Sequence, residues 1–331
     1  MNGRMDEPLL AIRDLRVAFA RDREYFEAVR GISLHVDHGE VLGIVGESGS
    51  GKSVAMLSAL GLQPKTARVA GSVRFQGREL VGMPMRELRQ LRGSRIAMIF
   101  QDPLSSLNPV MTVGAQIAEA VFLHHPAVSK RAAMKRAIEL LELVAIPQPE
   151  RRIRQFPHEF SGGMRQRVMI AMAVANDPDL LIADEPTTAL DVTVQAQIMA
   201  VLADLQQRLK LGLILITHDL GVLAGHADRV AVVYSGEVVE QASGDDLFER
   251  PRHPYTRGLI ASIPNMAEQK DRLFSIEGLP PPLGRHPGGC AFHPRCPQAQ
   301  AICRTTPPVL QDFGNHCAAC HFAAAPAESA A

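Results

Sequence analysis

Short apolar runs alternate along the chain with longer segments in which apolar residues recur every three or four positions. A short apolar run bounded by turn residues is typical of a buried strand, whereas the longer spacing is typical of a helix with one buried face. The predicted strands cover residues 9–19, 32–36, 41–45, 71–75, 95–100, 180–183, 213–217 and 229–234. The predicted helices cover residues 52–62, 112–123, 129–144, 161–174 and 193–210. Strands that alternate with helices in this way predict an α/β fold.

The pattern changes twice along the chain, which indicates how it is divided. Between about residues 102 and 176 it is helical, which predicts a helical insert within an α/β core of residues 8–250. From Pro251 onward Pro and Gly become dense and all five cysteines occur, so we expect a small Cys-rich C-terminal domain over residues 251–323. The last stretch, 324–331, is polar and rich in Ala, and we expect it to be disordered.

The composition excludes several classes of function. The 331 residues include 35 basic and 35 acidic side chains, a balance that gives no reason to expect bulk nucleic acid as a partner. With no Trp and only three Tyr, the chain is poor in the aromatic side chains on which single-stranded bases stack. No apolar run approaches the roughly 20 residues of a membrane span. The first ten residues lack the basic and apolar regions of a signal peptide, so we expect a protein that is made and kept in the cytosol.

The most informative motif follows the strand predicted at 41–45. The sequence GESGSGKS, residues 46–53, matches the pattern G-x-x-x-x-G-K-[ST] of a loop that binds nucleoside triphosphates. Glycine permits the tight turn that aims backbone N–H groups at phosphates, and the positive end of the following helix faces the same anions. Lys52 supplies a charge for the β- and γ-phosphates, and the Ser53 hydroxyl is placed for Mg²⁺. A Gly-rich turn that matches by chance is the weaker alternative.

Two carboxylates end the strand predicted at 180–183. Asp184, at the tip of a strand beside such a loop, can hold Mg²⁺ through water, and Glu185 can polarise the attacking water. A solvated acidic pair at a strand end is the alternative. The sequence EPTTALD, which continues from Glu185 to Asp191, extends the motif and favours the catalytic interpretation.

Three more polar motifs stand at the ends of predicted elements. Ser161 precedes Gly162 and Gly163 at the start of a helix, where a serine cap and bare backbone N–H groups would form a second anion site. Gln101 and His218 each follow a predicted strand. Each motif taken alone is also explained by an ordinary helix cap or a polar residue at a strand end.

In their order and spacing these motifs resemble those of the ATP-binding-cassette ATPases, and the resemblance covers about residues 9–248. It implies a P-loop core with a helical insert and an antiparallel β subdomain. It also implies that two such domains close head to tail, with each ATP between the P-loop of one chain and the Ser-Gly-Gly segment of the other.

The resemblance assigns a role to each motif residue. Gln101 senses metal and water, Asp184 supports Mg²⁺, Glu185 is the catalytic base and His218 contacts the γ-phosphate. Ser161, Gly162 and Gly163 reach the γ-phosphate of the partner's nucleotide, and Asp191 belongs to a segment that crosses the dimer seam. Phe19 matches the aromatic residue that stacks on adenine, although Tyr25 and Phe26 lie close to it in sequence. Phosphates and Mg²⁺ are held by Gly46, Ser48, Gly49, Ser50, Gly51, Lys52 and Ser53.

The C-terminal segment resembles a narrower group. The sequence RHPYT at 252–256, followed by cysteines, is similar to the segment after the ATPase core in peptide and nickel importers. The chain as a whole looks like the D-type ATPase subunit of a bacterial dipeptide or oligopeptide importer. This resemblance implies a peripheral subunit at the cytoplasmic face of the inner membrane. Its partners would be a related F-type ATPase in a heterodimer, two membrane permeases and an external peptide-binding protein. A groove beside Gln101 and the helical insert would receive the permeases' coupling helix.

The cysteines pose a separate question. None occurs before Cys290, and thiols clustered in a reducing cytosol favour metal over disulfides. Their spacing is too open for a zinc ribbon built from paired C-x2-C knuckles. The resemblance implies a [4Fe-4S] cluster with Cys317 as the spare thiol. Its ligands would be Cys290, Cys296, Cys303 and Cys320. Zinc, with His293 or His316 as a further ligand, and free structural thiols remain alternatives.

The sequence leaves the cargo open, because the ATPase subunit does not touch it. Dipeptides, longer peptides, nickel chelates and glutathione are all compatible with the motifs. A soluble cassette ATPase that acts on ribosomes or DNA is the alternative from another class. Such proteins typically have a second cassette, a long coiled coil or a zinc insertion. The sequence has none of these features.

Overall fold

The central strands of the fold are short and almost wholly apolar. Every residue of β3 (Val41–Val45), β7 (Leu180–Asp184) and β8 (Gly212–Thr217) is buried. Strands covered on both faces read as continuous apolar runs, and this explains why these three were predictable without any alternation of polar and apolar residues. The computed structural model describes residues 7–21, 24–102, 106–188, 190–263 and 274–323. The predicted disordered end, 324–331, lies outside the described residues.

The described residues form two compact units, each assembled from separate stretches of chain. The first contains residues up to 9, 36–40 and 82–216, and the second contains residues 10–35, 41–81 and 217 onward. Because the chain passes several times between the units, each unit brings together residues that are far apart in sequence.

Three parallel strands form the sheet of the first unit. Its order is β6 (Ile96–Ile99), β7, β8, with Ile99 opposite Ala183 and Asp184 opposite Ile216. Parallel strands end at the same edge, so the residues that follow β6 and β7 come close together there. Helix α8 (Val192–Leu209) follows β7 in the chain, and α2 (Met85–Leu91) precedes β6.

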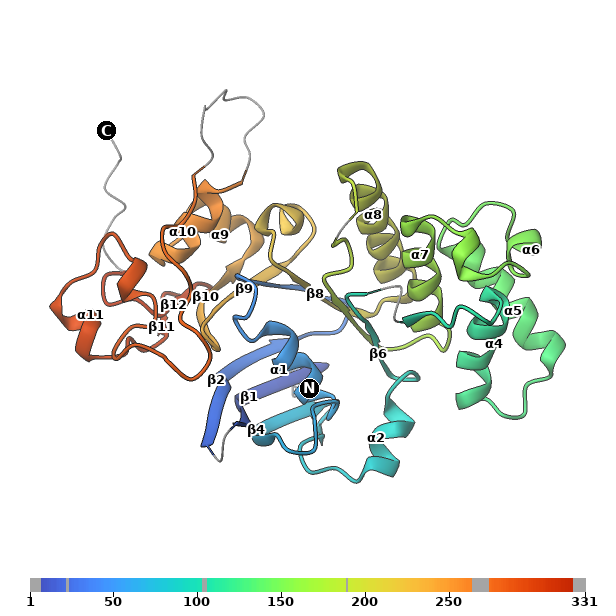
Figure 1. Cartoon of the computed structure of the whole chain (residues 1–331), viewed down its shortest axis with the longest axis horizontal. Helices are drawn as coiled ribbons and strands as arrows, with labels where there is room; N and C mark the ends of the chain where they lie inside the picture. Colours follow the sequence, from blue (N-terminus) through green and yellow to red (C-terminus); the bar gives the residue numbers. More distant parts are fainter. Residues whose placement is uncertain (1–6, 22–23, 103–105, 189, 264–273, 324–331) are drawn as a thin grey trace, which may run out of the picture. The chain divides into compact units, whose positions relative to one another are not determined.

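The predicted helical insert is present in this unit and appears in green in Figure 1. It contains α4 (Val113–His124), α5 (Lys130–Leu143), the short α6 (Pro149–Arg152) and α7 (Gly162–Ala173). Thr112 caps α4 and Ser129 caps α5, each through a side-chain oxygen that accepts a backbone N–H bond. Helices α4, α5 and α7 pack against one another. No helix among the described residues has both the length and the apolar content needed to cross a membrane.

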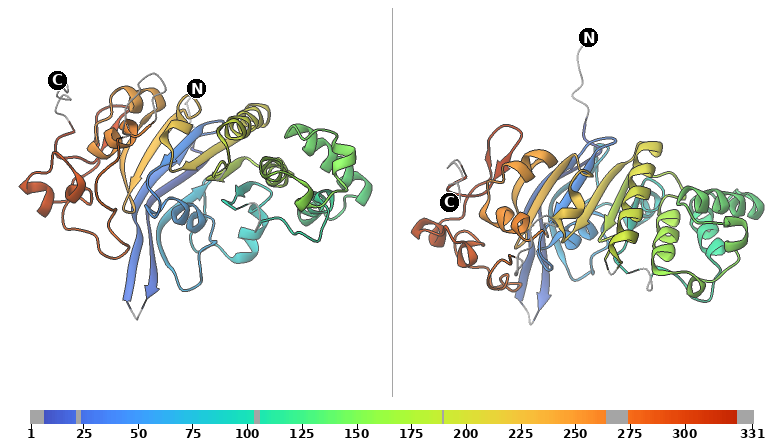
Figure 2. Two further views of the ribbon diagram at one scale, coloured as in Figure 1. Left: turned by 45° about the horizontal axis from the view of Figure 1, so that its top comes forward. Right: turned by 90° about the horizontal axis from the view of Figure 1, so that it is seen from above.

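The second unit contains the antiparallel β subdomain. Its strand order is β2 (Glu24–Val36), β1 (Leu10–Arg21), β4 (Arg68–Phe75), β5 (Arg78–Glu79). Strands β1 and β4 pair antiparallel from Leu10 opposite Phe75, with a bulge between Arg13 and Arg16. Figure 2 shows β1 and β2 as a long blue pair that extends beyond the other strands of this unit.

A further set of strands in the second unit pairs strands of the predicted α/β core with strands of the C-terminal segment after Pro251. Strand β9 (Arg229–Tyr234) pairs with β3 in parallel and with β10 (Glu237–Ser243) antiparallel. Strand β12 (Cys317–Ala318) pairs with β10, and β11 (Gln311–Asp312) pairs with β12. The β10–β12 pairing thus connects chain on both sides of Pro251. The domain boundary expected there stays a prediction.

All eight predicted strands and all five predicted helices are present, with shifts at their ends. Helix α1 (Lys52–Ala59) stops short of the predicted Leu62 because Gly61 adopts a left-handed φ of +63°. The sequence patterns missed β10 and several short helices, which include α9 (Gly244–Glu249), α10 (Pro254–Ala261) and α11 (Ala301–Thr305). The short helices have too few residues for a periodic pattern to stand out, and β10, with the sequence EVVEQAS, lacks the continuous apolar run of the predicted central strands.

Candidate active site

The loop between β3 and α1 has a backbone that requires glycine at two positions. A Cβ atom at Gly46 would lie 2.1 Å from the carbonyl oxygen of Val233, and one at Gly51 would lie 2.6 Å from that of Ala28. Gly51, which precedes the first residue of α1, also has a φ of +99°. The close approach of the backbone and the helix that begins at Lys52 are features of an anion-binding loop, and phosphate binding here stays a prediction.

Lys52 is buried in this loop and bonds to its backbone. The Lys52 ammonium donates to the carbonyl oxygens of Gly46 at 2.6 Å and Glu47 at 3.0 Å, and to Ser50 Oγ at 3.4 Å. The Ser50 carbonyl in turn accepts from the N–H of Gly236 at 2.8 Å. The charge of Lys52 is therefore held inside the loop, in keeping with the role in phosphate binding that the motif predicts. Ser53, the residue expected to hold Mg²⁺, is partly buried in the first turn of α1.

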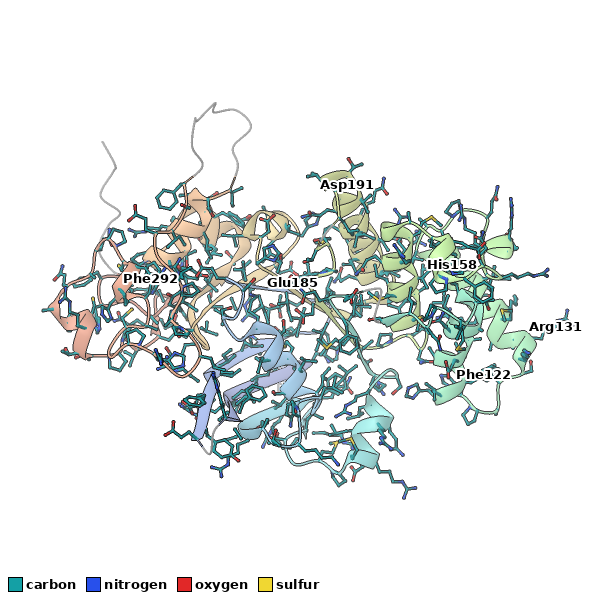
Figure 3. The ribbon with its side chains drawn as sticks, in the orientation of Figure 1. Phe122, Arg131, His158, Glu185, Asp191 and Phe292 are labelled. Carbon is teal, nitrogen blue, oxygen red and sulfur yellow. The ribbon has the colours of Figure 1, made fainter. Side chains whose placement is uncertain are left out.

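The first unit contains the second part of the predicted machinery. Gln101 Nε2 donates to Glu185 Oε2 at 2.8 Å, although the two residues are 84 positions apart. The hydroxyl of Thr188 donates to the same oxygen at 2.8 Å. Glu185 adopts a left-handed φ of +48°, and its N–H bonds to the carbonyl of Ile216 at 2.9 Å. Figure 3 labels Glu185.

Two side chains thus orient the Glu185 carboxylate, and a backbone bond fixes the position of the residue that carries it. A left-handed φ at a residue other than glycine costs energy and persists only where its surroundings enforce it. Asp184, one residue earlier, is 6% exposed at the end of β7. An oriented carboxylate next to a buried one is suited to hold a water molecule and a divalent ion. Sequence reasoning named Gln101, Asp184 and Glu185 but missed Thr188, whose only signal was its place three residues after Glu185.

Two other predicted residues lie at element ends: Ser161 forms the helix cap that its motif indicated, and Asp191 forms a cap that the sequence analysis did not predict. Ser161 caps α7, with its Oγ accepting from the N–H of Met164 at 3.4 Å. Asp191 caps α8, with its carboxylate accepting from the N–H of Val194 at 2.9 Å. A Cβ atom at Gly163 would meet Val194 Cγ1 at 2.4 Å, so this glycine is required where α7 packs on α8. Figure 3 labels Asp191, the residue before α8.

His218 and the three aromatic candidates lie in the second unit. His218 directly follows β8 and is exposed. Phe19 on β1 is partly buried, and the Arg68 guanidinium lies 3.6 Å from the centre of the Tyr25 ring. Phe26 on β2 lies against the backbone at Gly284, where a Cβ atom would be 2.0 Å from its ring. That Phe19 is the residue that stacks on adenine therefore stays a prediction.

The C-terminal segment brings four of the five cysteines to one cavity. Its empty volume is about 330 Å³, which includes open solvent. The cysteines that line it are Cys290, Cys296, Cys303 and Cys320. Cys317 is not among the lining residues, and its thiol lies 3.8 Å from an Asp312 oxygen. In the described part of the chain no group of three or more Cys, His, Asp or Glu side chains is arranged so that it could hold a metal ion.

Burial governs the chemistry of these thiols. It raises the pKa of Cys290 and Cys320, and it raises the pKa of Cys296 to about 11. Since thiols with a raised pKa are protonated at neutral pH, metal binding would have to release their protons and draw the sulfur atoms together. The donors fit a thiolate-bound metal in kind and number, but they are not arranged for one.

Histidines border the same cavity, and sequence reasoning identified only one of them. His293 lines it, as do His253 and His321. His253 is 1% exposed, and burial lowers its pKa to about 4, so this ring is neutral at pH 7. His316, the other histidine considered for zinc, instead lies 2.6 Å from the buried carboxylate of Glu240. The only sequence signal for His253 was its place in RHPYT.

The fold and these sites define a P-loop nucleotide-binding protein of the ATP-binding-cassette class. Residues 29–188 match the family model described as ABC transporter. Residues 239–303 match the one described as oligopeptide/dipeptide transporter, C-terminal region. The chain belongs to the family of ABC transporter ATP-binding proteins that have this C-terminal region.

Relatives similar to nearly the whole chain include the oligopeptide transport ATP-binding protein OppD of Bacillus subtilis and the dipeptide transport ATP-binding protein DppD of Haemophilus influenzae. The OppD protein is 51% identical over 93% of this chain and 87% of its own length. The DppD protein is 51% identical over 95% of this chain and 95% of its own length. The OppD protein of Mycobacterium tuberculosis is 55% identical over 95% of the chain, which spans only 52% of that relative's length.

Among solved structures, the dimeric ABC transporter cassette MJ0796 is 28% identical. The match has a TM-score of 0.63 and covers 71% of this chain and 98% of that one. CbiO1 of Clostridium perfringens, part of the ABC transporter complex cbiONQ, is 26% identical with a TM-score of 0.63, over 74% of this chain and 92% of its own.

Proposed function

We propose that this chain binds and hydrolyses ATP to energise the import of dipeptides or oligopeptides, at the cytoplasmic face of the inner membrane. The observation that carries the proposal is the hydrogen bond from Gln101 to Glu185, because it joins two residues of the ATPase motifs that are 84 positions apart in the sequence. The matched C-terminal region and the names of the relatives support a peptide as cargo.

The chemistry follows from the groups in each unit. The backbone of the P-loop and the Lys52 ammonium would bind the β- and γ-phosphates, and Ser53 and Asp184 would hold Mg²⁺. The metal would neutralise charge that develops on the phosphates. Glu185, oriented by Gln101 and Thr188, would accept a proton from the attacking water. His218 would contact the γ-phosphate.

The proposal includes an assembly. Ser161, Gly162 and Gly163 would reach the nucleotide bound by a second cassette, and Asp191 would lie in the segment between the two. Support comes from two solved structures of the cassette MJ0796 that are described as dimeric, one of them bound to ADP and phosphate. We propose that the second cassette is a related F-type ATPase and that two permeases and an external peptide-binding protein complete the importer.

We also propose that the cavity cysteines bind a [4Fe-4S] cluster through four thiolates. Four thiols around one cavity, with Cys317 outside it, support this set of ligands. Zinc bound by three of these thiols and His293 is the alternative, because this ring lines the same cavity. Iron and sulfide analysis together with a visible absorption spectrum, after anaerobic purification, distinguishes the two, because a zinc site contains neither iron nor sulfide and does not absorb visible light.

The test of peptide import is reconstitution of the chain with its genetic neighbours. With permeases and the F-type ATPase co-expressed, the chain should fractionate with membranes, and a peptide-loaded binding protein should stimulate ATP hydrolysis. Glu185→Gln in this chain and the matching change in its partner should abolish the stimulation. If ATP hydrolysis is stimulated by nickel chelates or glutathione and not by peptides, the cargo is one of those compounds and not a peptide. Hydrolysis that depends on ribosomes or DNA and not on membranes would contradict the proposal and favour a soluble cassette ATPase.

A further inference from the structure

Glu47, the second residue of the P-loop, is held by two side chains from the C-terminal part of the chain. The Arg295 guanidinium donates to both carboxylate oxygens of Glu47, from Nη1 at 2.6 Å and from Nη2 at 2.9 Å. The backbone N–H of Glu47 donates to the hydroxyl of Tyr255 at 2.8 Å. Side chain and backbone of one loop residue are therefore both fixed from positions more than 200 residues away.

These contacts are shielded from solvent. The side chain of Arg295 is 5% exposed, that of Glu47 is 27% exposed, and Tyr255 is fully buried. The rings of Tyr234 and Phe292 lie 5.9 Å and 6.0 Å from the guanidinium carbon of Arg295, and Figure 3 labels Phe292 in the C-terminal segment. A planar guanidinium that meets a carboxylate through two bonds resists displacement more than a single exposed ion pair.

Arg295 is itself anchored to backbone on its own side. Its Nε donates to the carbonyl of Glu277 at 3.0 Å, and its Nη2 donates to the carbonyl of Ile276 at 3.3 Å. It is also the last residue of a short 3-10 helix, His293–Arg295. The guanidinium thus bridges the loop at Glu47 and two stretches of the C-terminal segment.

The same loop residue supports Lys52. The carbonyl of Glu47 accepts from the Lys52 ammonium at 3.0 Å, next to the 2.6 Å bond to Gly46. A shift of the Glu47 backbone would therefore move an acceptor that sets the position of this ammonium. Glu47 thus links Arg295 to Lys52, because it bonds directly to both side chains.

We propose that Arg295 is a positioning residue for ATP binding, which holds the P-loop and Lys52 through Glu47 in the geometry that receives the phosphates. The inference rests on the proposed function of Lys52 in binding nucleotide. It gives the C-terminal segment a part in nucleotide affinity beyond its own folding. Without the two bonds from Arg295 to Glu47, the loop has more conformations to lose when ATP binds, so the affinity for ATP falls.

The test measures binding of a fluorescent ATP analogue with Mg²⁺ to the purified full chain. Arg295→Gln should raise its Kd by about 5- to 30-fold, the ratio that corresponds to 1–2 kcal/mol. Arg295→Lys should give a smaller increase, because an ammonium keeps the charge but not the planar fork. Adding Glu47→Gln to Arg295→Gln should raise the Kd no further, since both changes break one interaction.

Arg304→Gln is the matched control, because Arg304 is an exposed arginine of the same segment. It should leave the Kd within twofold of the wild-type value. Thermal unfolding of every variant, followed in parallel, separates loss of stability from loss of affinity. A wild-type Kd in folded Arg295→Gln, whatever its melting temperature, would overturn the inference. If Arg295→Gln does not fold, Glu47→Gln decides by the same criterion.

The inference and the proposed function can fail separately. Wild-type chain that binds no nucleotide, or binds it equally after Lys52→Ala, would refute both. Wild-type binding that Lys52→Ala abolishes and Arg295→Gln leaves unchanged would refute only the positioning role of Arg295.

Discussion

Gly162 and Gly163, the first two residues of α7, allow a test of whether the Ser-Gly-Gly segment contacts a second chain's nucleotide. A Cβ atom at Gly162 has Leu190 Cδ2 as its nearest neighbour at 3.5 Å, an ordinary contact. A Cβ atom at Gly163 would lie 2.4 Å from Val194 Cγ1. Aspartate at the first position therefore adds a charge without a clash, whereas aspartate at the second changes both charge and packing.

The expected effects on stability differ in sign. Gly162→Asp should stabilise the chain slightly, since losing a flexible glycine contributes about 0.4–1 kcal/mol where the backbone accepts a side chain. An acidic residue in the first turn of a helix adds about 0.3–1 kcal/mol. Gly163→Asp should destabilise it by about 1–3 kcal/mol, the usual cost of forcing atoms into a packed contact. Only Gly162→Asp is therefore free of a structural explanation for lost activity.

The expected effect on hydrolysis comes from charge. A carboxylate about 5 Å from a phosphate charge, at an effective dielectric of about 20, is repelled by about 3 kcal/mol. Hydrolysis in the assembled ATPase should then fall by at least about 100-fold in Gly162→Asp. Binding of ATP to this chain's own P-loop should remain within a few-fold of normal. Gly162→Asn, which has nearly the same shape without the charge, should retain much more activity.

ATP turnover of the assembly, nucleotide binding by the isolated chain and thermal unfolding are measured on the same three variants. Normal turnover in a stable Gly162→Asp variant would refute the contact in trans. In that case Ser161 and the two glycines would be no more than a helix cap. Equal losses in Gly162→Asp and Gly162→Asn would also refute the argument from charge.

Three further predictions concern other parts of the chain. Glu185→Gln should bind ATP within a few-fold of normal but lose about 10²–10⁴ in turnover, the usual contribution of a general base, and near-normal turnover with the same change in the partner would assign the base elsewhere. Cys296→Ser should lower metal content and loosen the C-terminal segment while nucleotide still binds, whereas Cys317→Ser should do neither; equal metal in both variants, measured by elemental analysis, would contradict the choice of ligands. Glu240 is buried, which by itself raises its pKa, but bonds from His316 and from backbone N–H groups hold that pKa below the ordinary 4.5. Its carboxylate therefore stabilises the fold above pH 4.5 and loses that effect as the pH falls through the lowered pKa, so Glu240→Gln should lower the melting temperature at pH 7 and approach the wild-type value only in acid.

Local motifs made a large part of this protein predictable. The P-loop is eight consecutive residues, so the spacing of its glycines, lysine and serine was enough to recognise it from the sequence. Strands β3, β7 and β8 were also predictable, because complete burial leaves an uninterrupted apolar run. The cap at Ser161 was equally local, since its Oγ bonds to a backbone N–H three residues ahead.

Contacts between distant residues followed from no local pattern. The bond between Gln101 and Glu185 exists because β6 and β7 are parallel neighbours that end at one edge, and strand order is a property of the whole sheet. The fork from Arg295 to Glu47 joins residues 248 positions apart, and neither belongs to a motif that predicts the other. The sequence by itself thus determined the elements and the chemistry available to them. Only the tertiary structure decided which of those groups meet, because that depends on long-range packing of buried surfaces.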